Sequence, residues 1–585
     1  MIKRLARCIR EYKWATILSP LCMIGEVYME VKIPLVLSKI VDLGVEMGDM
    51  GAVVQYGLIL VLYALLSLAF GIASAVFASY AATGFSRNLR HDMYYKVQTF
   101  DFSNIDKFST SSIVTRLTSD VANIQMAFQM MIRMAIRCPM MLILATSNAY
   151  SISPRLCVVY CVVLPLLGLG LYLLIRTVFP IFDRVFKTYD KLNNVVQENL
   201  HGIRVVKSFV RENRETEKFT TVSGEIYKDF CKAEHTMAFN NPLMQLAVYT
   251  CIIVISYLGA TMVVQSGNDA ALGLTTGQLT SMFTYTTQIL SSLMMLSMVF
   301  VMLTMARAPL RRTTEILTET PDLDNPKVPV TAVPDGSIDF ENVSFRYSKA
   351  ADRNALEGIQ LHIDPGMTVG ILGSTGSSKS TLVQLIPRLY DATEGTVRVG
   401  GIDVRDYDIT TLRDAVSMVL QKNVLFSGTI KDNLRWGNPD ATDEEMLHAC
   451  RLACADDFIQ NFPDKYDTHI EQGGTNVSGG QKQRLCIARA LLKKPQILIL
   501  DDSTSAVDTH TDAMIRKAFR EEIPGTTKLI IAQRISSIED ADLILVLDGG
   551  KIADQGTHEE LLRTSTIYQE VYHSQTKGGE EECPL

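Results

Sequence analysis

The sequence lacks an excess of positive charge. Its 585 residues include 56 Lys and Arg against 63 Asp and Glu, which makes the formal net charge −7. Proteins that bind nucleic acid present a face rich in Lys and Arg, so this balance disfavours a nucleic-acid partner. Charged residues of both signs amount to only 20% of the chain, whereas hydrophobic residues amount to 47%. We expect two or more domains of unlike character, because the chain is too long for one.

Paired cysteine motifs are absent as well. The eleven cysteines include no Cys-x-x-Cys pair, and the closest pairs, Cys157/Cys161 and Cys450/Cys454, fall in apolar or helical stretches. We interpret these cysteines as small core residues rather than metal ligands. The first 14 residues are basic and amphipathic, and no short apolar run with a small-residue cleavage site follows them. We therefore expect no cleaved signal peptide.

Long stretches without Asp, Glu, Lys or Arg dominate the first half of the chain. They cover residues 53–86, 156–175, 235–268 and 270–306. Each reaches the roughly 20 apolar residues that a helix needs to cross a bilayer. Two weaker candidates lie at 14–42, which contains several charges, and at 138–154, extended backwards past two arginines. The sequence therefore predicts a bundle of six transmembrane helices.

Loop charges predict the orientation of these helices. The predicted outer loops contain Glu46, Asp49 and Asp269 but only one base, Arg155. Positive charge collects on the cytoplasmic side of membrane proteins, and the segment before the first span contains Lys3, Arg4, Arg7, Arg10 and Lys13. We expect a cytoplasmic N-terminus, a location in the plasma membrane, and two long cytoplasmic connections at residues 87–123 and 176–234.

Two glutamates lie inside the first predicted span. Glu26 and Glu30 are one helical turn apart, and ionisable groups at such positions are costly unless they are paired or face water. One interpretation is a cation-attracting patch in a substrate cavity. The alternative is hydrogen bonding to neighbouring helices, or pairing of Glu30 with Lys32. For Arg133 and Arg137 we expect side chains that reach up to lipid phosphates.

The composition changes after residue 312. Four prolines between residues 321 and 334 indicate an extended linker. Beyond it, short β-type runs alternate with helical patterns, which indicates an α/β domain with a mainly parallel sheet. We predict a transmembrane domain at 1–312, a linker at 313–334, this α/β domain at 335–575 and an acidic tail at 576–585.

A glycine loop follows a strand-like run in the second half and precedes a helix. It reads Gly373-Ser374-Thr375-Gly376-Ser377-Ser378-Lys379-Ser380-Thr381. This context defines a P-loop: backbone N–H groups surround the phosphates of ATP, Lys379 contacts the β- and γ-phosphates, and Ser380 supplies a hydroxyl to Mg²⁺. The helix N-terminus adds partial positive charge. Ser378 departs from the pattern, which has glycine before the lysine.

Two further motifs accompany the P-loop. A buried strand-like run ends at Asp501-Asp502, where Asp501 is placed to hold Mg²⁺ and Asp502 takes the position of the water-activating carboxylate. The second motif is Val477-Ser478-Gly479-Gly480-Gln481, at the start of an Arg- and Ala-rich helix. This helix start suits contact with phosphate, and a simple capping turn is the alternative.

Together these motifs resemble the ATP-binding cassette superfamily. The order is P-loop, Gln421, a VSGGQ close to the LSGGQ signature, and the acidic motif, while Tyr347 matches the aromatic residue that stacks on adenine and Ser505–Asp508 matches the D-loop. Residues 115–121 and 198–207 are similar to the intracellular-loop patterns of six-span exporters. The resemblance implies two cassettes that close head to tail around ATP and Mg²⁺, with Gln421 at the metal and the reacting water.

The resemblance also marks two departures. Family members that hydrolyse ATP have Glu after the Mg²⁺ aspartate and His in the switch loop, whereas this chain has Asp502 and Gln533. The chain thus resembles the degenerate subunit of heterodimeric multidrug-type exporters, which implies a partner half-transporter with intact Glu and His. Alternatives are a slow homodimeric exporter and an ATP-sensing regulatory or channel-like subunit.

The resemblance further implies alternating access. Closure of the cassettes would pass through residues 102–109 and 201–208 to the spans, and would move a small amphiphilic substrate (a drug, lipid or peptide) out of the cell. The 25 methionines suit an adaptable apolar cavity, although they suit ordinary helix packing equally well.

Overall fold

The chain forms two compact units. The computed structural model describes residues 2–269, 273–348, 353–503 and 505–577. The first unit contains the chain up to Gln98 and Ser109–Glu319, and the second contains Thr99–Phe108 and the chain from Thr320 onwards. The first unit therefore extends past the predicted boundary at residue 312. The segment Thr99–Phe108 belongs to the second unit, although it lies inside the range that the sequence assigned to the membrane domain.

The first unit is entirely helical where it is described. Its elements are α1 (Ile2–Arg7), η1 (Arg10–Tyr12), α2 (Lys13–Lys39), η2 (Ile40–Val45), α3 (Met50–Gln98), α5 (Thr110–Thr115), η3 (Arg116–Asp120), α6 (Val121–Ile152), α7 (Pro154–His201), α8 (Ile203–Ser208), α9 (Glu212–Ala238), α10 (Asn240–Ser266), α11 (Thr276–Met305) and α12 (Arg307–Thr318).

Five helical stretches among the described residues are long and apolar enough to cross a membrane. They are Met50–Gln98, Thr110–Ile152, Pro154–His201, Glu212–Ser266 and Thr276–Thr318. The remaining predicted span lies in the 27-residue α2, whose length of about 40 Å at 1.5 Å per residue is also sufficient. Helix α2 packs along α3 and α6. We count it as the sixth helix of a membrane bundle, as predicted, although its charges set it apart.

Burial in the bundle is the pattern of a membrane protein. Met23, Val27 and Tyr285 are fully or almost fully buried at the centre of the bundle. Large apolar side chains such as Leu62 of α3 and Ile253 of α10 are exposed on the outside. Lipid tails, which are as apolar as these side chains, are the natural solvent for such a surface.

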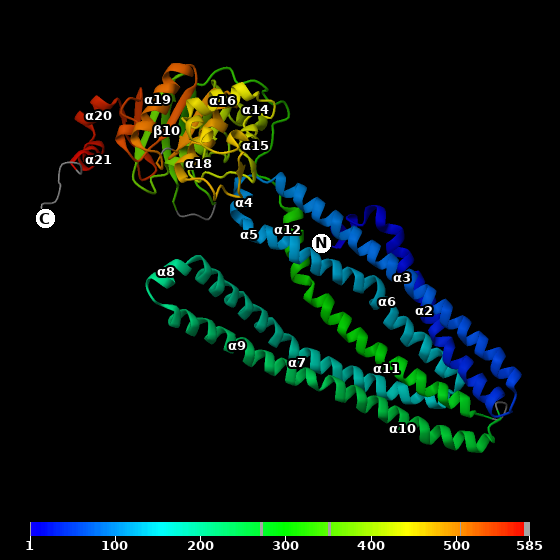
Figure 1. The fold of residues 1–585 in the computed structure, drawn as a ribbon. Coiled ribbons are helices and arrows are strands. Elements are labelled where there is room, and N and C mark those ends of the chain that lie inside the picture. Colours follow the sequence, from blue (N-terminus) through cyan, green and yellow to red (C-terminus); the bar gives the residue numbers. More distant parts are fainter. Residues whose placement is uncertain (1, 270–272, 349–352, 504, 578–585) are drawn as a thin grey trace. The chain divides into compact units, whose positions relative to one another are not determined.

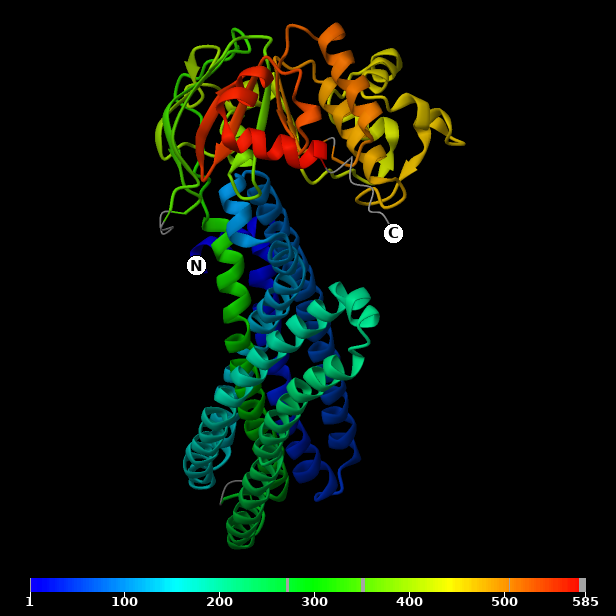
Figure 2. The same cartoon turned by 90° about the vertical axis from the view of Figure 1, so that its left-hand side faces the viewer.

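Helices α7 and α9 form a long hairpin closed by the short helix α8. They lie side by side in both ribbon views (Figures 1 and 2). At its tip, Val205, Phe209 and Val210 are 59%, 72% and 79% exposed. This tip corresponds to the second segment for which the sequence predicts a coupling role.

The second unit contains a mainly parallel sheet flanked by helices, as predicted. Its strand order is β12-β11-β3-β10-β9-β6, in which only β12 is antiparallel to its neighbour. An antiparallel sheet of order β2-β1-β4-β5 accompanies it. The strands are β1 (Ile338–Phe345), β2 (Leu356–Ile363), β3 (Thr368–Gly373), β4 (Glu394–Val399), β5 (Ile402–Asp403), β6 (Val416–Val419), β7 (Gly428–Thr429), β8 (His469–Ile470), β9 (Ile497–Asp501), β10 (Thr527–Ile531), β11 (Leu543–Asp548) and β12 (Lys551–Gly556).

Helices surround these sheets. They are α4 (Phe102–Phe108), α13 (Lys379–Gln384), α14 (Ile409–Ala415), α15 (Ile430–Arg435), α16 (Asp443–Leu452), α17 (Asp456–Gln460), η4 (Lys465–Asp467), α18 (Gly479–Leu491), α19 (Thr509–Glu522), η5 (Ile535–Ser537), α20 (His558–Thr564) and α21 (Thr566–Lys577). The strands β3, β9 and β10 are buried along almost their whole length. Such continuous burial is typical of parallel strands covered on both faces.

The cysteines are free thiols where the structure describes them. Cys8, Cys138, Cys157, Cys251, Cys450 and Cys486 are buried, whereas Cys161 is exposed. Within the described ranges, no three His, Cys, Asp or Glu side chains gather as a metal-binding group. Cys583 and the rest of the predicted acidic tail from residue 578 lie outside the described residues.

Candidate functional site

Four parallel strands end at the same edge of the central sheet. Ile531 of β10 pairs with both Ile371 of β3 and Asp501 of β9, and Val419 of β6 pairs with Leu500 of β9. Since ligands bind at the carboxyl ends of parallel strands, this edge is the expected place for a nucleotide. The P-loop, the switch loop, the acidic motif and the Gln421 loop all leave the sheet here.

The P-loop runs from β3 into α13. The Lys379 ammonium donates hydrogen bonds of 2.8 Å to the carbonyls of Gly373 and Ser374. Burial of the ammonium lowers the pKa of Lys379, although the nearby negative charges of Asp502 and Asp501 act to raise it. Gly373 is required, because a Cβ there would lie 2.4 Å from the Leu547 carbonyl oxygen. Ser374, Thr375 and Gly376 are exposed, so their backbone is open to a ligand.

Ser378 adopts a left-handed backbone conformation. It is the N-cap residue of α13, with φ +69° and ψ 26°. A residue with a Cβ is strained in this region by roughly 1–2 kcal/mol, whereas glycine is not. The replacement of glycine by Ser378 therefore places backbone strain inside the loop that is predicted to contact the phosphates.

Ser380 and Asp501, the two residues predicted to hold Mg²⁺, lie side by side. The Ser380 hydroxyl donates a hydrogen bond of 2.9 Å to Asp501 Oδ1. Burial raises the pKa of Asp501, and the neighbouring Asp502 charge adds to the effect. A hydroxyl oxygen and a carboxylate oxygen this close together fit Mg²⁺, which prefers hard oxygen ligands. When bound, the ion would neutralise charge on the phosphates of ATP.

The three predicted catalytic residues meet at Asp502. Gln533 Nε2 donates a hydrogen bond of 2.8 Å to Asp502 Oδ2, and the Gln421 side chain also hydrogen-bonds to this carboxylate. Burial raises the pKa of Asp502, although both hydrogen bonds and the Lys379 charge oppose the rise. Asp502 itself has φ +50°. The sequence also predicts Gln421 at the metal; the contact seen in the structure is the one with Asp502.

Tyr347 lies beside the P-loop helix. Its hydroxyl is 2.9 Å from the Thr381 hydroxyl, and its side chain is half exposed. The ring packs edge-on against Phe345 and Tyr390, at centroid distances of 4.9 and 5.3 Å. Burial of the hydroxyl raises the pKa of Tyr347. The remaining exposed ring can stack on an aromatic base.

Tyr390 is a residue that sequence reasoning missed. Its hydroxyl donates a hydrogen bond of 2.8 Å to Asp106 of α4, and its ring lies edge-on to Phe102 at 6.0 Å. The pKa of Tyr390 is raised by burial and by the Asp106 carboxylate. Helix α4 is thus tied to the ring cluster that contains Tyr347. The two residues are 284 positions apart, so no local pattern marks the pair.

A second set of hydrogen bonds holds α4 through Asp101, the residue that precedes it. Asp101 accepts hydrogen bonds from the backbone of Asn104, Asp322 and Leu323 and from the Ser103 hydroxyl. Burial opposes ionisation of Asp101, but these four bonds prevail and lower its pKa. The predicted first coupling segment is therefore joined to both the linker and the nucleotide site of the second unit.

The signature sequence caps α18. Ser478 accepts a hydrogen bond from the Gln481 backbone, and Gln481 accepts one of 2.9 Å from the Ser478 backbone. The capping turn that the sequence left open as an alternative is therefore present at the start of α18. Gly480 is required, because a Cβ would lie 2.8 Å from the Ala506 carbonyl oxygen. Ser478 and Gly479 remain exposed, so the helix start is free to contact a phosphate.

An arginine joins the two membrane glutamates. Arg137 of α6 donates to Glu26 and, at 2.7 Å, to Glu30, both of α2. The expectation that Arg137 reaches lipid phosphates is therefore wrong, because two carboxylates within reach bind it more favourably. The pairing of Glu30 with Lys32 is also wrong, since Lys32 points to Asn148 at 3.5 Å. Glu26 Oε2 is buried and has no hydrogen-bond partner among the described residues.

Arg133 lies one turn before Arg137. Its side chain is half-buried, and its Nε is buried without a hydrogen-bond partner in the described part of the chain. The expected reach to lipid phosphates remains a prediction for this residue.

The fold and this edge of the sheet define a class of protein: a membrane transporter with a P-loop ATP-binding domain fused to its helices. The family model "ABC transporter transmembrane region" matches residues 16–294, and the model "ABC transporter" matches residues 356–505. The chain belongs to the ABC transporter family. It is an ATP-hydrolysing membrane exporter subunit, and such exporters act as dimers in the bilayer.

Relatives match over nearly the whole chain. The uncharacterized ABC transporter ATP-binding protein YfiB of Bacillus subtilis (strain 168) is 34% identical over 98% of this chain and 99% of its own length. YknU of the same organism is 34% identical over 98% and 97%. A solved structure of a bacterial Atm1-family ABC exporter with ATP bound has a TM-score of 0.82 and 25% identity, covering 98% of this chain and 99% of that one.

Proposed function

We propose that this chain is the degenerate-site subunit of a heterodimeric ABC exporter. The observation that carries the proposal is the hydrogen bond from Gln533 to Asp502. It brings the two residues that depart from the family pattern together, beside the Ser380–Asp501 pair. The P-loop, Ser380 and Asp501 support ATP binding at this site, but both groups that would act on the attacking water are altered.

The alterations weaken hydrolysis for physical reasons. An aspartate is one methylene shorter than a glutamate, so the carboxylate of Asp502 stops about 1 Å short of the productive position. An error of that size costs on the order of 100-fold in rate. Gln533 can hydrogen-bond to a phosphate but has no ring that titrates near neutral pH. Strain at Ser378 adds a third departure in the same site.

The signature contributes to the other site. Ser478, Gly479, Gly480 and Gln481 preserve the exposed helix start, and only the first letter of the motif differs from the family pattern. In the two-chain sandwich of the family, this surface completes the partner's ATP site. We infer a partner half-transporter with Glu and His at the matching positions and an altered signature of its own.

The transport cycle follows from this assignment. ATP closes the two cassettes, α4 and the α8 tip pass the closure to the spans, and an amphiphilic substrate leaves toward the outside. The N-terminus and the ATP-binding domain face the cytoplasm at the plasma membrane. Two carboxylates and one guanidinium leave one net negative charge at Glu26–Arg137–Glu30, which supports a preference for cationic amphiphiles.

A restoring substitution tests the proposal. Asp502→Glu combined with Gln533→His should raise ATP turnover of the purified exporter about tenfold or more. The glutamate restores the reach of the carboxylate, and the histidine restores a group that titrates near neutral pH. The matched control is the partner's own glutamate changed to Gln, which should abolish turnover in the unmodified exporter. If turnover stays unchanged while ATP still binds, the two residues are not the cause of slow hydrolysis. Brisk hydrolysis by the chain alone would indicate a homodimer instead.

A further inference from the structure

The C-terminal helix contacts the switch loop through one amide side chain. Gln575, in the last described turn of α21, donates from Nε2 to the Gln533 carbonyl at 2.8 Å. Its Oε1 accepts from the Ile535 backbone at 2.9 Å. A glutamine has one donor group and one acceptor group on the same planar amide, and here both are used on residues two positions apart. Such a paired contact fixes both the place and the direction of a loop.

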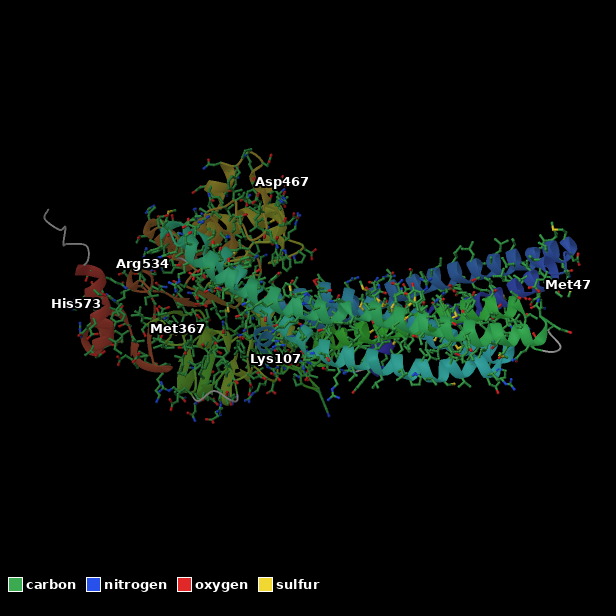
Figure 3. All side chains as sticks on the ribbon, turned by 90° about the horizontal axis from the view of Figure 1, so that it is seen from below. Met47, Lys107, Met367, Asp467, Arg534 and His573 are labelled. Carbon is green, nitrogen blue, oxygen red and sulfur yellow. The ribbon has the colours of Figure 1, made fainter. Side chains whose placement is uncertain are left out.

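Helix α21 is anchored before it reaches the loop. Tyr568, in its first turn, is fully buried, and its hydroxyl lies 2.7 Å from His558 Nδ1 of α20. Gln569 Nε2 donates to the Leu562 carbonyl at 2.8 Å. The start of α21 is thus packed against the domain core, and its far end presents Gln575 to the switch loop. Figure 1 shows α21 at the edge of the ATP-binding unit, and Figure 3 labels His573 on this helix and Arg534 on the switch loop.

The switch loop is otherwise exposed at this point. Gln533 and Arg534 are both exposed to solvent, directly after the buried strand β10. The Gln533 side chain points to Asp502, and its Nε2 donates a hydrogen bond of 2.8 Å to Asp502 Oδ2. Gln533 therefore takes part in two hydrogen bonds: its backbone carbonyl accepts from Gln575, and its side chain donates to Asp502.

We propose that Gln575 is a positioning residue for Gln533, so that the C-terminal helix controls how firmly this chain retains ATP. This inference rests on the proposed function, which assigns the ATP site to these residues. Gln533 is the group that faces a bound γ-phosphate in that assignment. Without the Gln575 bonds the loop backbone is free to move, and Gln533 spends less time in the orientation that holds nucleotide.

The test follows release of a radiolabelled azido-ATP photoprobe from the full-length exporter in lipid nanodiscs, with Mg²⁺. After loading, unlabelled ATP is added, samples are irradiated at intervals, and the label on this chain is counted. Gln575→Ala should accelerate release about threefold to tenfold, the effect of losing one exposed and one partly buried hydrogen bond. Gln575→Glu should accelerate it at least as much, because a carboxylate cannot donate to the Gln533 carbonyl.

Two controls separate positioning from mere folding. Gln569→Ala removes an amide from the same helix and should lower the melting temperature without changing release. In a Gln533→Ala background, Gln575→Ala should produce no further acceleration, because the residue through which it acts is gone. Release that is unchanged in Gln575→Ala, or equally fast in Gln569→Ala, overturns the inference, and so does acceleration that persists without the Gln533 side chain.

A further variant tests the assignment of the ATP site separately. Lys379→Ala should abolish photolabelling of this chain. If labelling persists in that variant, the assignment of the ATP site is wrong. If labelling is lost but Gln575→Ala has no effect, only the positioning role fails.

Discussion

Tyr390 donates its hydroxyl proton to the carboxylate of Asp106 across 2.8 Å. The Tyr390 ring contacts both Tyr347, the predicted adenine contact, at a centroid distance of 5.3 Å and Phe102 of α4 at 6.0 Å. Within the ATP-binding unit, one aromatic side chain therefore contacts both the predicted nucleotide site and a segment that follows the helix α3 in the chain. A movement of the Tyr347 ring on ATP binding would therefore displace Tyr390, which is hydrogen-bonded to α4.

Tyr390→Phe should weaken the coupling of ATP to transport. The ring packing stays, while the bond to a charged acceptor, worth roughly 1.5–3 kcal/mol when buried and less at this exposed position, is lost. We expect substrate transport per ATP hydrolysed to fall about threefold, measured in proteoliposomes, with ATP affinity unchanged. Tyr407→Phe, which removes a buried bond to the Val399 carbonyl, is the control for general destabilisation. Equal losses in both variants would contradict a coupling role.

Ser378→Gly should stabilise the chain. The substitution removes the strain of a Cβ at φ +69°, and we expect a gain of about 1 kcal/mol, seen as a higher melting temperature. ATP affinity should rise as well, because the backbone can approach the phosphates more closely. Lys465, with φ +47°, is strained in the same way but lies on η4. Lys465→Gly should therefore raise the melting temperature and leave ATP affinity unchanged.

Asp502→Asn should change how stability depends on pH. The pKa of Asp502 is raised in the folded chain, chiefly by burial, so the native state binds its proton more readily than the unfolded state. Stability then increases as pH falls through the folded pKa, and the unfavourable charge is fully present at neutral pH. Without nucleotide, the Asp502→Asn variant should melt higher than the original chain at pH 7. The difference should shrink towards pH 4, and a gap that stays constant would contradict the cause we give.

Arg137→Leu should destabilise the membrane helices severely. It leaves Glu26 and Glu30 without a cation, and breaking a buried ion pair in this way costs about 3–5 kcal/mol. We expect low yield and a lower melting temperature in detergent. Adding Glu26→Gln and Glu30→Gln should restore most of the stability, because no uncompensated charge remains. Such a triple variant should still move neutral amphiphiles but should lose preference for cationic ones.

Much of the nucleotide site could be predicted from the order of residues alone. The P-loop, Asp501 and the signature are short contiguous patterns that each specify a local backbone conformation, and parallel strands bring their carboxyl ends to one edge. The sequence also marks Ser378 as a departure from the P-loop pattern, whereas its left-handed backbone conformation is seen only in the structure. By contrast, the sequence could not show that Arg137 belongs to the glutamates. From helix position alone, lipid phosphates are the favoured partner of such an arginine.

The amino-acid sequence is sufficient to specify which helices are apolar enough for a bilayer and where the predicted P-loop lies, because hydrophobic runs and the glycine loop are patterns of consecutive residues. Which distant groups share a hydrogen bond depends instead on the folded chain. Arg137 meets Glu30 across 107 positions, Tyr390 meets Asp106 across 284, and Gln575 meets Gln533 across 42. A long polar side chain bonds to whatever packing places within about 3 Å of it, and packing is a property of the whole fold.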